Sequence, residues 1–176
     1  ANQRAQIAGV RGAGLILAVN AGNPDDVFQE SVGIGEDDIY MSESLLATKD
    51  GGFDSRKAGD EYTQIIKAQK IDAYRRQHGF KVWGYPTSRL NGGNVPSNLM
   101  NISYYGAIMF GYDSFGWGEL NEGGNGLNPY RQRPNVNVGT TFTGDVKKNG
   151  DVYTRQTNAG TIKLDMANKN ASFIPK

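Results

Sequence analysis

The sequence predicts an α+β protein that is rich in β-structure, with one main helix in an N-terminal domain and an antiparallel meander after it. Twenty-four glycines in 176 residues are about twice the average share, which is typical of a chain with many turns. Only the segment 60–78 has a convincing helical pattern, whereas the last third alternates short apolar runs with turn formers.

The elements before this helix are expected to be short. Glycines at positions 9, 12 and 14 indicate a turn, and the apolar run 15–19 after them predicts a buried strand. A second short strand is expected within 31–35. The apolar residues of 39–47 follow neither a helical nor a strand period, so we expect that segment to be irregular.

The main helix is expected to begin near Asp60, which is a good N-cap residue, and to end near His78. Arg75, Arg76 and His78 would lie in its last turn, where positive charge suits the negative end of the helix dipole. Gly79 is the residue type expected immediately after a helix.

A strand at 80–85 is expected after the helix, because apolar and polar residues alternate there up to a proline. The segment 87–98 that follows is poor in bulky apolar residues and rich in turn formers, which indicates a linker. The sequence therefore predicts two domains, 1–95 and 96–176.

The second domain is expected to be the antiparallel meander. Asn149 and Gly150 lie between two alternating runs, and both residue types tolerate the positive φ that the centre of a type I′ turn requires. The last strand would leave an unpaired sheet edge. The expected strands cover 101–106, 136–146, 152–157, 161–166 and 171–174.

Composition excludes several classes of function. Nineteen basic and 18 acidic residues nearly cancel, so the charge pattern of a nucleic-acid-binding protein is absent. Without cysteine, the chain has no disulfide, no thiol nucleophile and no cysteine-based metal site. No apolar run approaches the length of a transmembrane helix.

The sequence favours a binding protein over an enzyme. His78 is the only histidine, and no Gly-x-Ser-x-Gly nucleophile motif is present. Two carboxylates facing one cleft would suit a β-rich enzyme that acts on carbohydrate. That alternative stays open, because the sequence singles out no particular pair.

His78 and its surroundings form the candidate cofactor site. The histidine precedes the aromatic strand 80–85, which is the kind of surrounding that a flat apolar cofactor such as haem requires, and its imidazole would be the metal ligand. The alternative is a capping imidazole that contacts the free carbonyls of the helix end. The other candidate cofactor-binding residues are Tyr40, Met41, Trp83, Tyr85 and Arg89.

The segment 111–135 is a candidate protein-binding surface. It is long for a hairpin loop, and long loops on a strand scaffold often carry binding residues. Tyrosine and tryptophan are the usual anchors of such surfaces. The aromatic residues of this segment are Tyr112, Phe115, Trp117 and Tyr130.

Two short motifs in the second domain carry a resemblance to a known family. Residues 101–106 read Asn-Ile-Ser-Tyr-Tyr-Gly, a small-x-x-Tyr-x-Gly pattern, and residues 165–169 read Asp-Met-x-Asn-Lys. They resemble the opening and the early strand pair of the eight-stranded barrel shared by transferrin-binding protein B, factor H-binding protein and related Gram-negative surface or secreted proteins. Met166 stands where the family pattern has Phe, and the segment 111–135 is a long aromatic insertion.

This resemblance covers about the last 75 residues. It implies that 96–176 forms part of such a barrel, incomplete because further strands would be needed after Lys176. It also implies an N-terminal ligand-binding domain. In the haemophilin-type haemophores, which are exported with the help of a surface lipoprotein assembly modulator, that domain binds haem through histidine. His78 matches that role by residue type and surroundings.

We therefore expect a secreted or surface-exposed bacterial protein that binds haem for iron acquisition, with an outer-membrane receptor as a further partner. The alternative is an adhesin or host-protein-binding module that uses the aromatic segment 111–135 and needs no cofactor. In neither case is catalysis expected.

Overall fold

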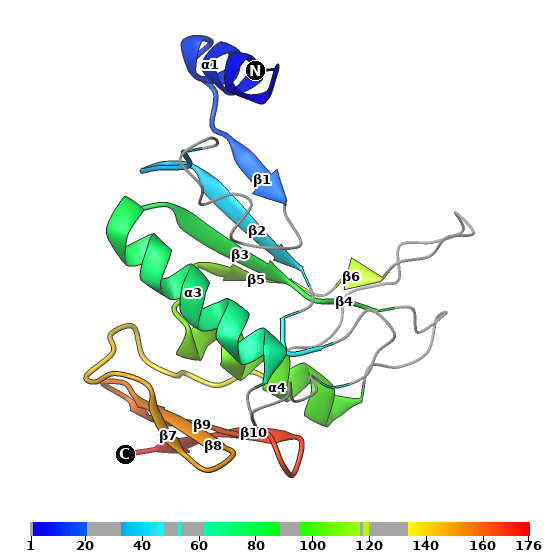
Figure 1. The fold of residues 1–176 in the computed structure, drawn as a ribbon. Coiled ribbons are helices and arrows are strands. Elements are labelled where there is room, and N and C mark those ends of the chain that lie inside the picture. The colour runs from blue at the N-terminus through cyan, green and yellow to red at the C-terminus, as the bar shows by residue number, and fades with distance from the viewer. Residues whose placement is uncertain are drawn as a thin grey trace.

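The computed structural model describes residues 2–20, 33–43, 45–47, 53, 62–88, 96–116, 118–119 and 134–176. These residues form an α/β structure in three layers (Figure 1). The helices are α1 (Asn2–Gly12), α3 (Thr63–His78) and α4 (Ser97–Met109). The strands are β1 (Ala18–Asn20), β2 (Ile39–Glu43), β3 (Lys81–Tyr85), β4 (Thr87–Ser88), β5 (Ser114–Phe115), β6 (Gly118–Glu119), β7 (Lys147–Asn149), β8 (Val152–Gln156), β9 (Gly160–Asp165) and β10 (Asn170–Pro175).

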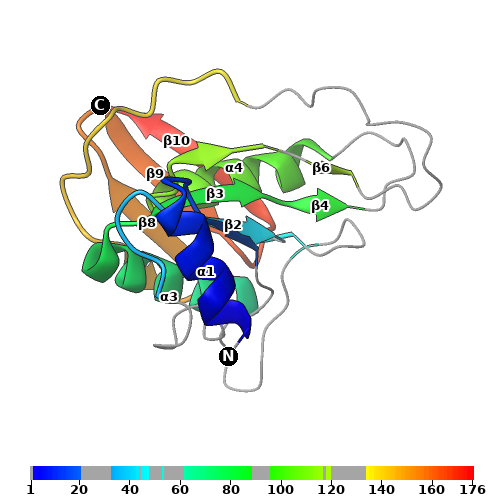
Figure 2. The same cartoon turned by 90° about the horizontal axis from the view of Figure 1, so that it is seen from above.

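The first layer is a parallel sheet with the strand order β1-β2-β3-β5. Figure 2 shows β2 and β3 side by side with their arrows pointing the same way. Helices α3 and α4 form the second layer, and the antiparallel sheet β10-β9-β8-β7 forms the third (Figure 1). The sequence predicted the antiparallel sheet and one main helix, but it did not predict a parallel sheet.

The prediction of an irregular segment at 39–47 is wrong for its first half, because Ile39–Glu43 is β2, a central strand. Tyr40 and Ser42 point to the helical layer and are buried, whereas Ile39, Met41 and Glu43, which alternate with them, are half-buried. A serine at an inward position conceals this alternation in the sequence. Tyr40 packs with Ile71 of α3 and Val82 of β3, which ties the sheet to its helix.

The start of the chain also differs from the prediction, because α1 extends through two of the glycines expected to form a turn. The expected strand at 15–19 overlaps β1 only partly, and Leu15 and Ile16 are 62% exposed instead of buried. Residues 33–35 are described and form no strand. Arg11 at the end of α1 reaches the buried Asp38 before β2, with Nη2 at 2.5 Å from Oδ2.

The helix predicted near 60–78 is confirmed by α3. Gly79 follows it with φ of 76°, and its N–H donates to the carbonyl of Arg75 at 2.8 Å, as expected of a glycine after a helix. Asp60, the predicted N-cap, lies outside the described residues. Ile65 and Ala68 are buried against the core, so α3 packs by one face. The strand predicted at 80–85 is likewise confirmed by β3.

The strand predicted at 101–106 is wrong, because these residues lie in α4. Nine of the 13 residues of α4 are buried, since the helix lies between the two sheets. A helix buried on nearly all sides has no polar face, so the helical period is hidden in its sequence. Gly106 lies against Leu46, where a Cβ atom would collide with the leucine side chain.

The C-terminal meander is confirmed, with three differences. Asn149 pairs with Val152, so the turn consists of Gly150 and Asp151, and only Gly150 has a positive φ, of 59°. The strand expected at 136–146 is reduced to one bridge, between Phe142 and Thr157. Among the described residues, the four strands β7 to β10 form an open sheet and no closed barrel.

One hydrophobic cluster fills the space between the helices and the meander. It contains Leu45 and Ile65 from the N-terminal half, Ile102 from α4, and Ile162 and Leu164 from β9. Residues on both sides of the boundary predicted near residue 95 therefore contribute to the same cluster.

Candidate ligand-binding face

The parallel sheet has helices on one face only among the described residues. The connections β2-α3-β3 and β3-α4-β5 move along the sheet in the same direction, and right-handed crossovers then place both helices on the same side. Parallel sheets are normally covered on both faces. We call the face away from the helices the outer face. Its side chains are Ala18, Asn20, Ile39, Met41, Glu43, Lys81, Trp83, Tyr85 and Ser114.

Trp83 and Met41 occupy the centre of the outer face. The two residues are direct partners across β3 and β2, and Ser114 of β5 pairs with Trp83 on its other side. Trp83 is 42% exposed, whereas Met41 is half-buried. An indole and a thioether side by side form an apolar surface that suits a flat ring.

A polar network lies next to this pair, where the parallel strands end. The carboxylate of Glu43 accepts two hydrogen bonds at Oε1, from Asn20 Nδ2 and from the Tyr85 hydroxyl, each at 3.1 Å. Lys67 of α3 donates from Nζ to the backbone carbonyl of Glu43 at 3.3 Å. Four elements thus converge on the carboxyl ends of the strands, which is where open α/β sheets bind their ligands.

Two groups of this network have shifted pKa values. Burial raises the pKa of Tyr85 to about 12, and the negative charge of Glu43 and its hydrogen bond add to the effect. Tyr85 is therefore a neutral donor near neutral pH. Burial lowers the pKa of Lys67, although the charge of Glu43 opposes the shift. Such shifts are typical of functional sites, where charges are placed in partly buried surroundings.

The structure brings three of the predicted cofactor-binding residues together, namely Met41, Trp83 and Tyr85. The other two that it describes lie elsewhere. His78 is exposed in the last turn of α3, where its ring stacks on Tyr74 with centroids 6.2 Å apart, and it is at the opposite end of β3 from Tyr85. Tyr40 is fully buried on the helical side of the sheet.

Arg89, the sixth predicted cofactor-binding residue, lies outside the described residues. His78, Trp83 and Tyr85 thus do not surround a common cavity. The hydroxyl of Tyr85 is already engaged as a donor to Glu43, and the raised pKa keeps it protonated, so it is not prepared to bind iron as a phenolate.

Two of the four aromatic residues predicted to bind a protein partner are packed against the core. The Tyr112 hydroxyl lies 3.2 Å from Ser42 Oγ, and burial raises the pKa of this tyrosine. Phe115 meets the ring of Tyr104 edge-on, with centroids 5.6 Å apart. Trp117 and Tyr130 lie outside the described residues.

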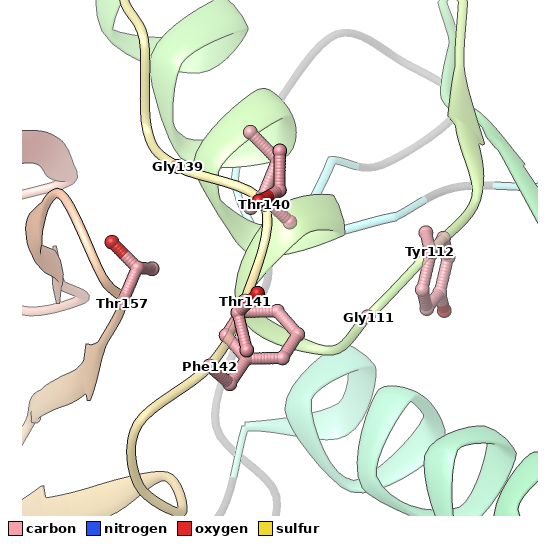
Figure 3. A pocket seen from close by; sticks show the side chains of 8 residues that line it. Gly111, Tyr112, Gly139, Thr140, Thr141, Phe142 and Thr157 are labelled. Carbon is pink, nitrogen blue, oxygen red and sulfur yellow. The ribbon is translucent and has the colours of Figure 1, made fainter.

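A pocket of about 200 Å³ lies beside the C-terminal end of α4 (Figure 3). Thr140, Thr141 and Phe142 lie on one loop between Gly111 and Tyr112 on one side and Thr157 on the other. It is smaller than the usual small-molecule site of about 300–1,000 Å³.

Several polar groups of this pocket serve the fold. The hydroxyl of Thr157 accepts the N–H groups of Ala159 and Gly160, each at 3.1 Å. Behind the pocket, the guanidinium of the buried Arg155 stacks on the ring of Phe142 at 3.5 Å. These contacts connect the loop to the meander, so the outer face is the stronger candidate for a binding site.

Sequence reasoning missed Asn20, Glu43 and Lys67. The signal that could have found them is their place at the ends of parallel strands, and it becomes visible only when β2 is recognised as a strand. A scan against protein-family models found no matching family, and a search of curated proteins found no match. Among the described helices, none is both long and apolar enough to cross a membrane.

Proposed function

We propose that this protein is a binding protein whose small ligand lies on the outer face, with a planar ring against Trp83 and Met41. The observation that carries the proposal is the 42% exposure of Trp83 at the centre of a parallel-sheet face. Exposing an indole to water costs hydrophobic free energy, so an exposed one beside a second apolar side chain is typical of a binding surface.

The shape and chemistry of the face support a planar ligand with one polar end. Side chains of adjacent strands lie about 5 Å apart, so Met41 and Trp83 together present a surface about as wide as a bicyclic ring. Glu43 and Tyr85 are the next pair along the same strands and the same face. A ligand that stacks on the first pair therefore meets the polar network of the second.

Nuclear magnetic resonance with quinoline, a planar molecule that is neutral at neutral pH, tests this proposal. We expect quinoline to shift the backbone amide resonances of β2 and β3, and the Trp83→Ala variant to lose those shifts. Ile174→Ala is the matched control, because Ile174 is an apolar side chain that is 54% exposed on the free face of the other sheet. Shifts that gather around Thr140 and Thr141, or no shifts at all, would refute the proposal.

Haem is the planar ligand that the sequence predicts, and we keep it as a proposal that has its own test. A haem titration followed in the Soret region should show a spectral shift, and His78→Ala should abolish the shift if the imidazole binds iron. A shift that survives in His78→Ala but disappears in Met41→Ala would indicate that haem binds on the outer face. No shift in the wild-type protein would remove haem from consideration.

A location outside the cell, secreted or at the surface, belongs to the same proposal. It rests on the family resemblance described above. Fractionation of the natural source tests it, since protein recovered only from the cytoplasmic fraction would contradict it.

A further inference from the structure

We propose that the polar end of the ligand is a cation, such as an amidinium, guanidinium or ammonium group, and that Glu43 recognises it at the carboxyl edge of the parallel sheet. This inference rests on the proposed function and gives the chemical class of the ligand. It follows from how the carboxylate of Glu43 is held and from what stands beside it.

The first step concerns the hydrogen bonds of Glu43. Both side-chain donors, Asn20 and Tyr85, are neutral, and both bind Oε1. Lys67 donates to the backbone carbonyl of Glu43 and not to the carboxylate, although the two opposite charges attract each other. Within the described part of the chain, Oε2 therefore accepts no hydrogen bond and the carboxylate forms no direct ion pair.

The second step concerns preorganisation. Glu43 is fixed from both sides, by Asn20 of β1 and by Tyr85 of β3, so little side-chain entropy remains to be lost when a ligand binds. Hydrogen bonds between a cation and a carboxylate are about twice as strong as neutral ones. A fixed carboxylate with one open oxygen is thus a selective receptor for a positively charged donor.

The third step concerns the aromatic ring beside the carboxylate. Trp83 lies two residues before Tyr85 on the same face of β3. A cation near the face of an indole is attracted by the ring quadrupole, and the attraction grows as the pair is shielded from water. A planar cation can therefore stack on Trp83 and donate to Glu43 at the same time.

The positive charges nearby do not prevent a cation from reaching the carboxylate of Glu43. Lys81 is also on the outer face, but it precedes Tyr85 by four residues, which is about 13 Å along a strand. Lys67 is closer, but it comes from α3, on the side of the sheet away from the outer face, and its Nζ donates to the backbone carbonyl of Glu43. An anionic group would instead find its partner at the Lys81 end of the face.

Three probes of the same size and shape separate charge from stacking: benzamidine, which is a cation, benzamide, which is neutral, and benzoate, which is an anion. The Trp117→Phe variant leaves Trp83 as the only tryptophan of the chain, so its fluorescence reports on the outer face. We expect benzamidine to bind about tenfold more tightly than benzamide, which corresponds to one charge-assisted contact. Benzoate should bind most weakly.

Glu43→Gln is the decisive variant, because glutamine keeps an oxygen for Asn20 and Tyr85 but carries no charge. It should reduce the preference for benzamidine over benzamide to about twofold or less. Glu36→Gln is the matched control: Glu36 is exposed and lies beside Gly79, before β3 begins, so the same change in net charge should leave the preference intact.

The outcomes distinguish this inference from the proposed function. If benzamide and benzamidine bind equally and both are lost in Trp83→Ala, the outer face binds planar ligands but the cation is refuted. A preference for benzoate, or an unchanged preference in Glu43→Gln, also refutes it. If none of the probes affects Trp83 fluorescence, both the inference and the proposed function fail.

Discussion

The two large sheets of this protein both pack one face against the same pair of helices, yet their free faces differ. The free face of the meander is mainly polar. Its residues are Lys147, Asn149, Val152, Thr154, Gln156, Thr161, Lys163, Asp165, Asn170, Ser172 and Ile174. The outer face of the parallel sheet instead has Ile39, Met41 and Trp83 in its central rows, with a carboxylate at one end.

This difference supports the proposed role of the outer face. A polar free face is the normal solvent surface of an antiparallel sheet, so the outside of the meander needs no further explanation. An exposed tryptophan next to a methionine is costly in water, and the chain retains it on the one sheet whose strand ends also carry a polar network. The meander packs on the helices, and the parallel sheet has the face on which we propose that the ligand binds.

The largest expected effect is on the free energy of unfolding. Leu164 of β9 is fully buried between the meander and α4, and Leu164→Ala should cost about 2–5 kcal/mol. Met41→Ala on the outer face should cost only about 1 kcal/mol, because Met41 is half-buried. Urea denaturation of both variants measures the difference. Equal losses would mean that the outer face is part of a packed core and not a free surface.

The next largest effect concerns one tightly packed glycine in each sheet. A Cβ atom on Gly160 would collide with the backbone oxygen of Ile174, so Gly160→Ala should destabilise the protein by about 1–3 kcal/mol. A Cβ atom on Gly84 of β3 would meet the side chains of Tyr112 and Leu45, at 2.9 and 3.3 Å. Because those side chains can shift, Gly84→Ala should cost less. Thermal unfolding of the two variants decides the order, and the reverse order would contradict this account.

The meander could be predicted because its signals are local. Alternation of buried and exposed residues in β8 and β9, and a glycine in the turn between β7 and β8, are readable within a few residues. Even there the sequence placed the turn one residue early, since Asn149 ends β7 and Gly150 supplies the positive φ. The end of α3 was readable for the same reason, because Gly79 marks it by itself.

The parallel sheet could not be predicted because its strands pair with segments that lie far away in the sequence. Strand β2 pairs with β1 and β3, which are separated from it by long stretches of chain. The residues near Ile39–Glu43 therefore give no signal of the strands with which β2 pairs. Helix α4 is hidden because burial on both sides removes its polar stripe. The candidate site shows the same difference, because Trp83 and Tyr85 were found on a readable strand, whereas Glu43, at the end of the unrecognised strand β2, was missed.

A third prediction concerns how open the outer face is. In the Trp117→Phe variant, acrylamide should quench Trp83 more strongly than a buried indole and less strongly than a free tryptophan analogue, because the residue is 42% exposed. Trp83→Ala should lower the free energy of unfolding by about 2 kcal/mol, whereas truncating a buried tryptophan costs about 3–5 kcal/mol. Quenching as weak as that of a buried indole would show that the outer face is covered.

The smallest expected effect is a pH dependence that originates at the carboxyl edge. The pKa of Tyr85 is raised to about 12 in the folded protein, from 10.0, because burial and the charge of Glu43 disfavour its phenolate. The unfolded chain ionises first, so the stability that Tyr85 contributes is complete below a pH of about 10 and is lost as the pH rises through about 12. Tyr85→Phe removes this loss, so the difference in unfolding free energy between wild type and variant should shrink over that range. Tyr112, whose pKa burial also raises, is present in both proteins and cancels in the comparison. A constant difference across that range would mean that Tyr85 is fully solvated and that its hydrogen bond does not hold Glu43 in place.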